Sequence, residues 1–479
     1  MFVAKKIAYN VLANSLSKIL TIVLALASLS LITRYLGKEG FGDYATALAF
    51  LSFFSALADL GLNSSLTREI SRPNASEKDI VSKIFSLRIV VSLLILLLAP
   101  FFVFLFPYSL EVKKAIVLVA ISFFFSSSYQ VLNGIFQKKL VMDKVALVEF
   151  LGKILQFLVI FVAVKFQMGF LWVVSSLLFY MIFNFIGVFW WSRKYLIFNF
   201  KIDWEYWKKF LKESYPIGIS ALVVFIYFKL DTILLSLLKT NSDVGIYNVA
   251  YKVIENITFF PAMIIGLVFP IFSQTIFSQK ERFFEVSNNI YKVFWIIVIP
   301  LLVGTIFFSK QIIYFIGGPN FSQSVLVLRI LIFALALIFF GNFFNSILIA
   351  GNKQNKLLKI LSLVAIFNIL LNLILIPKFS YLGAAFSSVF TEFLVVLGGV
   401  YVVSKELNYF PQIKNFSKII FSGIIMVLFF FLFRQYNFLV VGIIGSILYI
   451  LSLWLLGVVK SDEIGGIISI KRKKNAKFS

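Results

Sequence analysis

Long apolar runs separated by short polar segments dominate the pattern of this chain. A helix needs roughly 20 apolar residues to cross about 30 Å of hydrocarbon, and runs of that length recur throughout the sequence. They predict an all-α integral membrane protein with about fourteen transmembrane helices. The predicted spans start near Val11, Phe41, Ile84, Ala115, Val145, Phe170, Pro216, Tyr247, Tyr291, Val325, Leu357, Leu382, Ser417 and Phe438.

Two polar features interrupt this pattern near its start and its middle. Lys5, Lys6 and the triplet Ala25-Leu26-Ala27 resemble a signal peptide, but the apolar run continues to Ile32 and predicts a retained helix. The longest polar segment, 192–214, places Trp204, Trp207 and Leu211 on one helical face, with Asp203 as N-cap. It predicts an interfacial helix that joins two halves of the chain. A plain linker is the alternative.

The second half of the chain repeats the first. The stretch "LITRYLGKEGFGDYATA" and the stretch "LLKTNSDVGIYNVA", about 203 positions later, place Gly42 and Tyr44 in register with Gly245 and Tyr247. Six helices separate the copies, so both halves keep the same orientation and the pseudo-twofold axis follows the membrane normal. The predicted organisation is an N-terminal six-helix lobe at 1–192, a linker at 193–214, a second lobe at 215–404, and two extra helices with a basic tail at 405–479.

Composition supports the membrane assignment and excludes several chemistries. The chain is 61% hydrophobic, with a mean hydropathy of +0.98, which a soluble globular protein does not reach. It contains no cysteine and no histidine. Disulfides, thiolate catalysis and histidine-based metal or proton sites are therefore excluded.

The net charge of +24 is explained by topology. Counting Lys and Arg in the predicted loops gives 30 on the side of the chain ends and nine on the other side. The positive-inside rule therefore predicts that both termini are cytoplasmic. The excess charge predicts contact with anionic lipids, and no nucleic-acid partner is expected.

Several charged residues fall inside the predicted spans. A charge at the bilayer centre costs about 2.5 to 3.5 kcal/mol, so these residues must face one another or water. Spacing allows neutralising pairs between Glu149 and Lys153 and between Lys252 and Glu255. The basic residues are Lys18, Arg88, Lys153, Lys229, Lys252 and Arg329, and the acids are Asp59, Glu149, Asp231, Glu255 and Glu392.

Three stretches carry a resemblance to a known family. They are "RYLGKEGFGDYATALAFLSFFSALADLGL" with a following "TREI", "YPIGISALVVFIYFKLDTILL" with "DVGIYNVAYKV", and "AGNKQNKLLKI" with "NILLNLILIPKFSYLGAA". Over most of 9–405 the chain resembles the polysaccharide transport family, the Wzx-type flippases of the multidrug/oligosaccharidyl-lipid/polysaccharide exporter superfamily. The resemblance implies alternating access and translocation of polyprenyl-diphosphate-linked oligosaccharide from the cytoplasmic to the outer leaflet of a prokaryotic plasma membrane.

The resemblance also implies where substrate binds. It places Lys18, Lys229 and Lys252 on the first, seventh and eighth helices, which face the central cleft in this family. Lysine is a mobile point charge that binds phosphate without fixing one geometry. The predicted cavity residues are Lys18, Arg88, Lys229, Asp231, Lys252, Glu255 and Arg329. The glycine-rich turn at 31–47 is expected to form a tight external hairpin away from substrate.

The remaining predictions concern partners and competing functions. Sodium or proton coupling at Asp231 or Glu255, a monomeric state, and no cofactor, metal or catalytic residue are expected. The alternative function is another lipid or drug exporter of the same superfamily. A drug or cation exporter is disfavoured, because the first helix carries Lys18 and no acid. A membrane glycosyltransferase or polymerase is disfavoured by short external segments. The sequence also lacks the phosphate-binding loop of an ATPase.

Overall fold

The structure is almost entirely helical. A computed structural model of the chain describes residues 2–59, 62–71, 75–139 and 141–459. These residues form fifteen α-helices and one short 3₁₀ helix, with no strand within the described ranges. The all-α prediction is confirmed.

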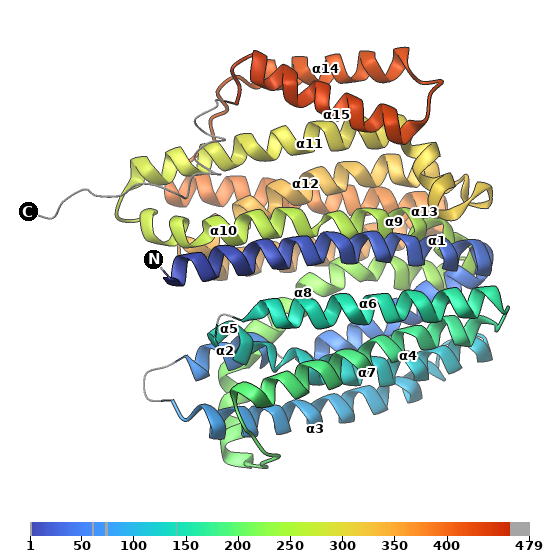
Figure 1. The fold of residues 1–479 in the computed structure, drawn as a ribbon, viewed down its shortest axis with the longest axis vertical. Coiled ribbons are helices and arrows are strands. Elements are labelled where there is room, and N and C mark those ends of the chain that lie inside the picture. Colours follow the sequence, from blue (N-terminus) through green and yellow to red (C-terminus); the bar gives the residue numbers. More distant parts are fainter. Residues whose placement is uncertain (1, 60–61, 72–74, 140, 460–479) are drawn as a thin grey trace, which may run out of the picture. The chain divides into compact units, whose positions relative to one another are not determined.

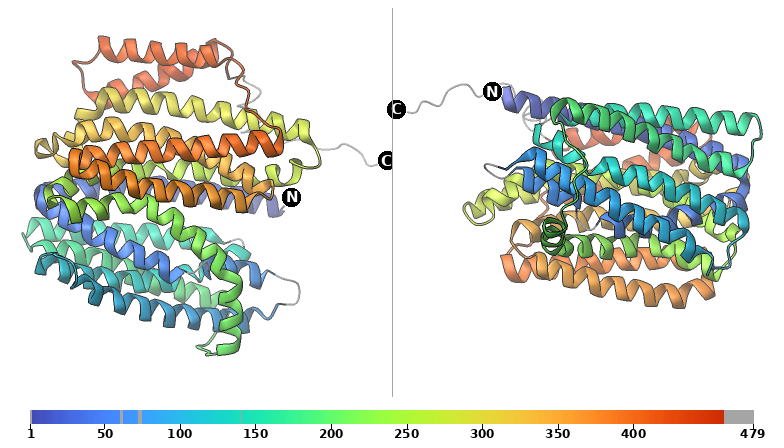
Figure 2. Two further views of the ribbon diagram at one scale, coloured as in Figure 1. Left: turned by 180° about the vertical axis from the view of Figure 1, so that it is seen from behind. Right: turned by 90° about the horizontal axis from the view of Figure 1, so that it is seen from below.

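The first of two compact units contains Met1–Asn256, Ile313–Val327 and Leu361–Thr391. Helices α3, α4, α6 and α7 lie side by side within it (Figure 1), and two further views show the same arrangement (Figure 2). The unit contains α1 (Phe2–Asp59), α2 (Leu62–Ile70), α3 (Glu77–Val103), α4 (Leu110–Gln130), α5 (Asn133–Lys139), α6 (Met142–Lys165), α7 (Phe170–Tyr195), α8 (Trp204–Leu238), nearly all of α9 (Asn241–Ile257) and the 3₁₀ helix η1 (Pro319–Phe321).

The second unit contains Ile257–Ile312, Leu328–Ile360 and Glu392–Ser479. Within it α14 packs on α15, and both contact α11 through a cluster that includes Phe308, Met426, Phe430 and Tyr449. Its helices are α10 (Phe259–Thr275), most of α11 (Lys280–Gly317), most of α12 (Ser324–Ala350), the two ends of α13 (Gln354–Leu407), α14 (Phe416–Leu432) and α15 (Phe438–Leu455). The predicted six-helix lobes follow the internal repeat rather than these contacts, and they stay a prediction.

Every predicted span start falls on a helix. Helices α1 and α13 each contain two spans, because the chain turns at Gly37 in α1 and at Ser380 in α13. The Gly37 turn has φ +67°, a region that glycine enters without strain. Ten helices in the described ranges are long and apolar enough to cross a membrane, which agrees with a multi-pass protein.

The predicted interfacial helix is not a separate element. Helix α8 runs without interruption from Trp204 to Leu238. Asp203 caps its start by accepting from the backbone N–H of Tyr206 at 3.0 Å. That bond and the Lys83 ammonium hold the pKa of Asp203 below its usual range.

The two tryptophans of this segment do not share one environment. Trp207 is buried and donates from its indole nitrogen to the Lys83 carbonyl at 2.8 Å, whereas Trp204 is 71% exposed. One tryptophan therefore fixes the start of α8 on α3. The other is available to the membrane interface.

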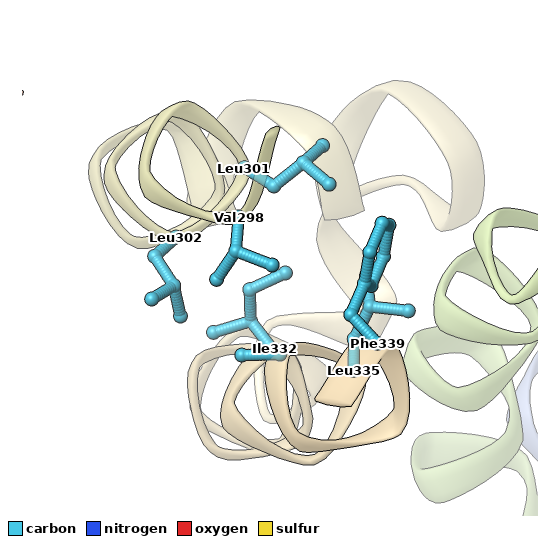
Figure 3. A pocket seen from close by; sticks show the side chains of 7 residues that line it. Val298, Leu301, Leu302, Ile332, Leu335 and Phe339 are labelled. Atoms are coloured by element: carbon cyan, nitrogen blue, oxygen red, sulfur yellow. The ribbon is translucent and has the colours of Figure 1, made fainter. Parts of the chain in front are cut away.

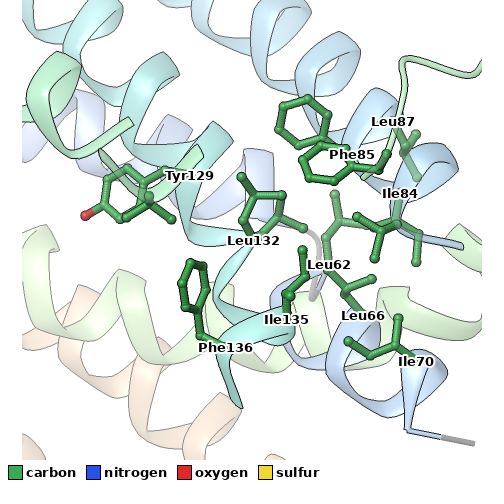
Figure 4. Packing of buried hydrophobic residues seen from close by; sticks show 14 of the residues in the cluster. Leu62, Leu66, Ile70, Ile84, Phe85, Leu87, Tyr129, Leu132, Ile135 and Phe136 are labelled. Atoms are coloured by element: carbon green, nitrogen blue, oxygen red, sulfur yellow. The ribbon is translucent and has the colours of Figure 1, made fainter. Parts of the chain in front are cut away.

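A buried cluster holds α2 and α5 against α3 (Figure 4). Leu62 and Leu66 of α2 pack with Ile84 of α3 and with Leu132 and Phe136, which lie before and within α5. These short helices cannot bury their apolar faces alone. The cluster therefore supplies their stability and closes one end of the first unit.

The internal repeat is visible as a reciprocal crossing of α1 and α9. A Cβ atom built on Gly42 would lie 1.8 Å from the carbonyl oxygen of Asn241, and one built on Gly245 would lie 2.1 Å from that of Lys38. Lys38 and Asn241 are separated by the same 203 positions as Gly42 and Gly245. Each copy of the motif therefore packs against the other by the same contact, as expected for a twofold relation.

Candidate functional site

A cavity of about 300 Å³ lies in the first unit between α1, α6, α7 and α9. Most of its wall is apolar, but one part carries charged and amide side chains. The polar lining residues are Ser28 and Tyr44 of α1, Lys153 and Gln156 of α6, and Lys252, Glu255 and Asn256 of α9. The cavity therefore offers both an apolar wall and a cationic wall.

Glu255 lies between two lysines at this cationic wall. Its carboxylate accepts from the Lys252 ammonium at 2.6 Å and also from the Lys229 ammonium. Lys252 is on the same helix, at i,i+3, whereas Lys229 comes from α8. The Lys229 ammonium also lies 4.9 Å from the ring centroid of Tyr251, a favourable cation–π distance.

Lys153 adds a third ammonium group from α6. It donates to the side-chain carbonyl of Gln156 at 2.8 Å, one turn along the helix, rather than to the expected partner Glu149. Its ammonium lies 5.4 Å from the ring centroid of Tyr180. The charges of Lys252 and Lys18 are close enough to repel it.

The predicted cavity residues fall into separate environments. Lys252 and Glu255 line the cavity. Lys229 does not line it but forms an ion pair with Glu255. Lys18 lies near Lys153 and Glu149. Their role in substrate binding stays a prediction.

Two predicted arginines lie elsewhere. Arg88 is 1% exposed and donates to the carbonyls of Ser127 and Ala58, at 3.1 and 2.6 Å, so it joins α3 to α4 and α1. Arg329, on α12 in the second unit, donates to the Ser309 hydroxyl at 2.7 Å.

Asp231 forms the centre of a second polar cluster, away from the lining of the cavity. Its carboxylate accepts from Ser388 at 2.5 Å, from Asn372 at 2.7 Å and from Tyr247 at 3.1 Å. Asn368 reaches the same carboxylate at 3.5 Å and donates to Thr391 at 2.8 Å. Helices α8 and α9 and both spans of α13 thus meet at one buried acid.

This cluster contains oxygen atoms of the kinds that can bind a small cation. The side-chain oxygen of Asn372 is buried with no hydrogen-bond partner, although its amide nitrogen is fully used. Carboxylate, amide and hydroxyl oxygens are the ligands that hard cations prefer. No group of three or more acidic, histidine or cysteine side chains suited to a divalent metal occurs in the part of the chain that the structure describes.

The glycine-rich turn contributes more than the expected hairpin. Phe41, Tyr44 and Leu48, which follow the turn, line the cavity. Before the turn, Arg34 donates to the carbonyls of Tyr314 and Phe315 at 3.3 and 2.9 Å. These carbonyls end α11, so the cation caps a helix C-terminus.

Sequence reasoning missed Lys153, Gln156 and Tyr44 as lining residues. The Lys153 and Gln156 spacing of three was a usable signal, because i,i+3 side chains lie on one helix face. The position of Tyr44 has no comparable local signal. Its burial against the cavity depends on how α1 turns and packs.

A second crevice lies between α11 and α12 in the second unit and is too narrow to hold a water molecule (Figure 3). Its walls are hydrocarbon only: Val298, Leu301 and Leu302 face Ile332, Leu335 and Phe339, with Ala336 alongside. It offers no polar group for a headgroup or a sugar.

Comparison with known proteins gives one family and several relatives. Residues 4–276 match a family described as Polysaccharide biosynthesis protein. An uncharacterized membrane protein of Methanocaldococcus jannaschii is 26% identical over 281 residues, 55% of either chain. Capsular polysaccharide biosynthesis protein CapF of Staphylococcus aureus is 24% identical over 410 residues, 83% of this chain and 98% of CapF.

The flippase-type relatives share less of their length. The probable low-salt glycan biosynthesis flippase Agl15 of Haloferax volcanii is 27% identical over 169 residues, 35% of this chain and 36% of that protein. The chain thus spans about half the length of the M. jannaschii relative and about a third of the H. volcanii one. Among solved structures, Lipid II flippase MurJ in an inward closed conformation has a TM-score of 0.74 at 19% identity, over 92% of this chain and 97% of MurJ.

Proposed function

Because the chain belongs to the polysaccharide biosynthesis protein family, we propose that it is a flippase for polyprenyl-diphosphate-linked oligosaccharide. It moves this lipid from the cytoplasmic to the outer leaflet by alternating access. The names of two relatives, a capsular polysaccharide biosynthesis protein and a probable glycan biosynthesis flippase, support this substrate class. The MurJ likeness supports the fold.

One observation carries the proposal: Lys153 and Lys252 line a cavity inside a membrane protein, and Lys229 bonds to Glu255 of the same cavity wall. A phosphate anion is costly in a low-dielectric interior unless cations compensate its charge. Lys153, Lys229 and Lys252 provide that compensation. Lysine ammonium groups, unlike arginine forks, release phosphate without breaking a bidentate geometry.

The geometry favours a carrier over an enzyme. The cavity lining contains one carboxylate, Glu255, and two lysines engage it. A transferase or polymerase would need a free general base or an acidic metal site beside the acceptor. We therefore propose transport without bond formation or cleavage.

We further propose that the coupling ion, sodium or a proton, binds at Asp231. The buried carboxylate and the unpaired Asn372 oxygen support this position over Glu255, whose carboxylate already has two lysine partners. Because α8, α9 and both spans of α13 meet there, an ion at Asp231 would change how these helices pack.

The cellular setting completes the proposal. The protein is a multi-pass membrane protein, and we place it as a monomer in a prokaryotic plasma membrane with both termini cytoplasmic. Its basic cytoplasmic segments contact anionic lipids. This orientation makes the inner leaflet the loading side.

The proposal is tested with purified protein in liposomes that contain a fluorescent polyprenyl-diphosphate-linked oligosaccharide. An impermeant quencher reports how fast the label exchanges between leaflets. We expect exchange well above protein-free liposomes, a large loss in the Lys153→Gln/Lys229→Gln/Lys252→Gln variant, and no change in the covalent structure of the lipid. Exchange equal to protein-free liposomes would reject the flippase, and new glycosidic bonds would identify an enzyme.

Ion coupling is tested separately with Asp231→Asn in the same liposomes. We expect wild-type exchange to accelerate with an inward sodium or proton gradient, and the variant to lose this dependence because it lacks the anionic ligand. Glu406→Gln is the matched control, since Glu406 pairs with Lys353 and Lys356 in the second unit. A gradient response that survives in Asp231→Asn would exclude this position.

A further inference from the structure

We propose that Glu255 is an internal counter-ion that the phosphate of the substrate displaces. It occupies the place between Lys229 and Lys252 that a phosphate takes in the loaded cavity, and it returns when substrate leaves. The inference rests on the proposed function. Glu255 then controls how tightly the substrate binds and how fast it is released, whereas the lysines bind its phosphate.

The geometry allows such an exchange. Glu255 lines the cavity, and its side chain is the most exposed of the three, at 33% against 26% for Lys252 and 17% for Lys229. A ligand entering the cavity therefore meets the carboxylate and the Lys252 ammonium, and it reaches the less exposed Lys229 ammonium by displacing the carboxylate that both lysines bind. The displaced carboxylate needs no new pocket, because it already faces the open space.

Charge explains why an acid is present at a site for an anion. Lys229 and Lys252 are a mutually repelling pair of cations, and leaving both without a partner inside the membrane is costly. Glu255 relieves this cost in the empty cavity. With Lys153 included, the three ammonium groups and one carboxylate have a formal net charge of +2, which matches a diphosphate diester with one negative charge on each phosphate.

The same arrangement limits how tightly substrate binds. A phosphate forms two contacts with lysines, but the two contacts that Glu255 already makes must break first. The free energy of binding therefore contains only the difference between these two sets of contacts. A carrier needs this balance, because a site that binds too tightly slows release. Removing the carboxylate should therefore raise affinity and lower turnover, whereas removing a group that only binds substrate lowers affinity.

The test measures binding of inorganic pyrophosphate to purified protein by titration calorimetry, and flipping at saturating lipid in liposomes. For Glu255→Gln we expect pyrophosphate binding about tenfold tighter than wild type, the scale of one charge-assisted contact. We expect a lower maximal flipping rate together with a lower KM. Glu255→Asp, which keeps the charge, should stay close to wild type in both measurements.

Two further variants keep the inference testable if Glu255→Gln folds poorly. Lys252→Gln leaves Glu255 to neutralise Lys229 and should bind pyrophosphate more weakly than wild type. Adding Glu255→Gln to that variant frees Lys229 and should restore binding. Thermal unfolding of each variant confirms that the comparison is between folded proteins.

Glu77→Gln is the matched control, because Glu77 also bridges two lysines, Lys138 and Lys139, at 2.8 and 3.2 Å, but outside the cavity. We expect it to leave pyrophosphate binding unchanged. Equal or weaker binding in folded Glu255→Gln, or no restoration in the double variant, would overturn the counter-ion role. Failure of wild-type protein to flip the lipid would instead reject the proposed function, since the binding measurement does not depend on flipping.

Discussion

Lys153 shows how a single side chain reaches a cavity from within a membrane helix. Its neighbour at i+3, Gln156, is 4% exposed and holds the ammonium at 2.8 Å. The Tyr180 ring adds a second favourable contact. A neutral amide positions the charge without cancelling it, so Lys153 differs from Lys229 and Lys252, whose charges Glu255 partly offsets.

This difference leads to a prediction for Lys153→Gln. A hydrogen bond to a charged group contributes about 1.5 to 3 kcal/mol, so we expect the KM for lipid-linked oligosaccharide to rise about tenfold or more. Thermal stability should change little. The measurement is the leaflet-exchange assay across a substrate series.

Lys165→Gln is the control for that experiment, because Lys165 is exposed at the C-terminal end of the same helix. Both variants remove one positive charge from α6. If they raise KM equally, the effect comes from net charge, and the specific role of Lys153 is rejected.

The repeated motif places a glycine of α1 and a glycine of α9 at the contact between these two helices. The turn at Gly37 starts the return segment of α1, and Gly42, five residues later, permits backbone contact with α9. Phe41 and Tyr44, on either side of Gly42, face the cavity, so the crossing lies beside it. Arg34 fixes the same region to the end of α11.

We predict that Gly42→Ala opens this crossing. The added methyl group would lie 1.8 Å from the Asn241 carbonyl oxygen, so the two helices must separate. A cysteine at Ser28, which lines the cavity, should then react faster with an impermeant thiol reagent added from outside. The cysteine-free sequence makes this label unique.

Gly266→Ala provides the comparison, since a Cβ atom there meets nothing within 4 Å. It replaces a helical glycine without a clash and should leave the reactivity of the Ser28 cysteine unchanged. Unchanged reactivity in Gly42→Ala as well would show that the crossing does not close the cavity.

For the whole molecule, the structure and the comparisons establish a multi-pass helical protein of the polysaccharide biosynthesis family. The orientation in the membrane rests on the charge distribution along the sequence. Under the proposed function, this orientation determines which leaflet loads the cavity.

Single cysteines at Lys78, Lys474 and Lys114 test that orientation in intact cells. With cytoplasmic termini, the first two are shielded from an impermeant reagent and the third is labelled, because Lys114 lies in a predicted external segment. Lys474 lies outside the described residues, whereas Lys78 and Lys114 are exposed. Labelling of Lys78→Cys or Lys474→Cys without disruption of the cells would contradict the predicted topology.

The sequence was sufficient for the properties that depend on neighbouring residues. Apolar runs of membrane-spanning length predicted the helices, and their starts all fall on helices in the structure. The motifs quoted above predicted the family, which the match over residues 4–276 confirms. The pair of Lys252 and Glu255 was also predictable, because i,i+3 spacing places both on one face.

The spacing of residues along the sequence does not predict contacts between different helices. Lys229 meets Glu255 from another helix, Asp231 meets Asn372 and Ser388 rather than the cavity, and Gly42 meets Asn241. Each contact depends on the rotation of two helices about their axes and on the distance between them. Hydropathy along the chain fixes neither quantity, so only tertiary packing determined which charges share the cavity and which are buried elsewhere.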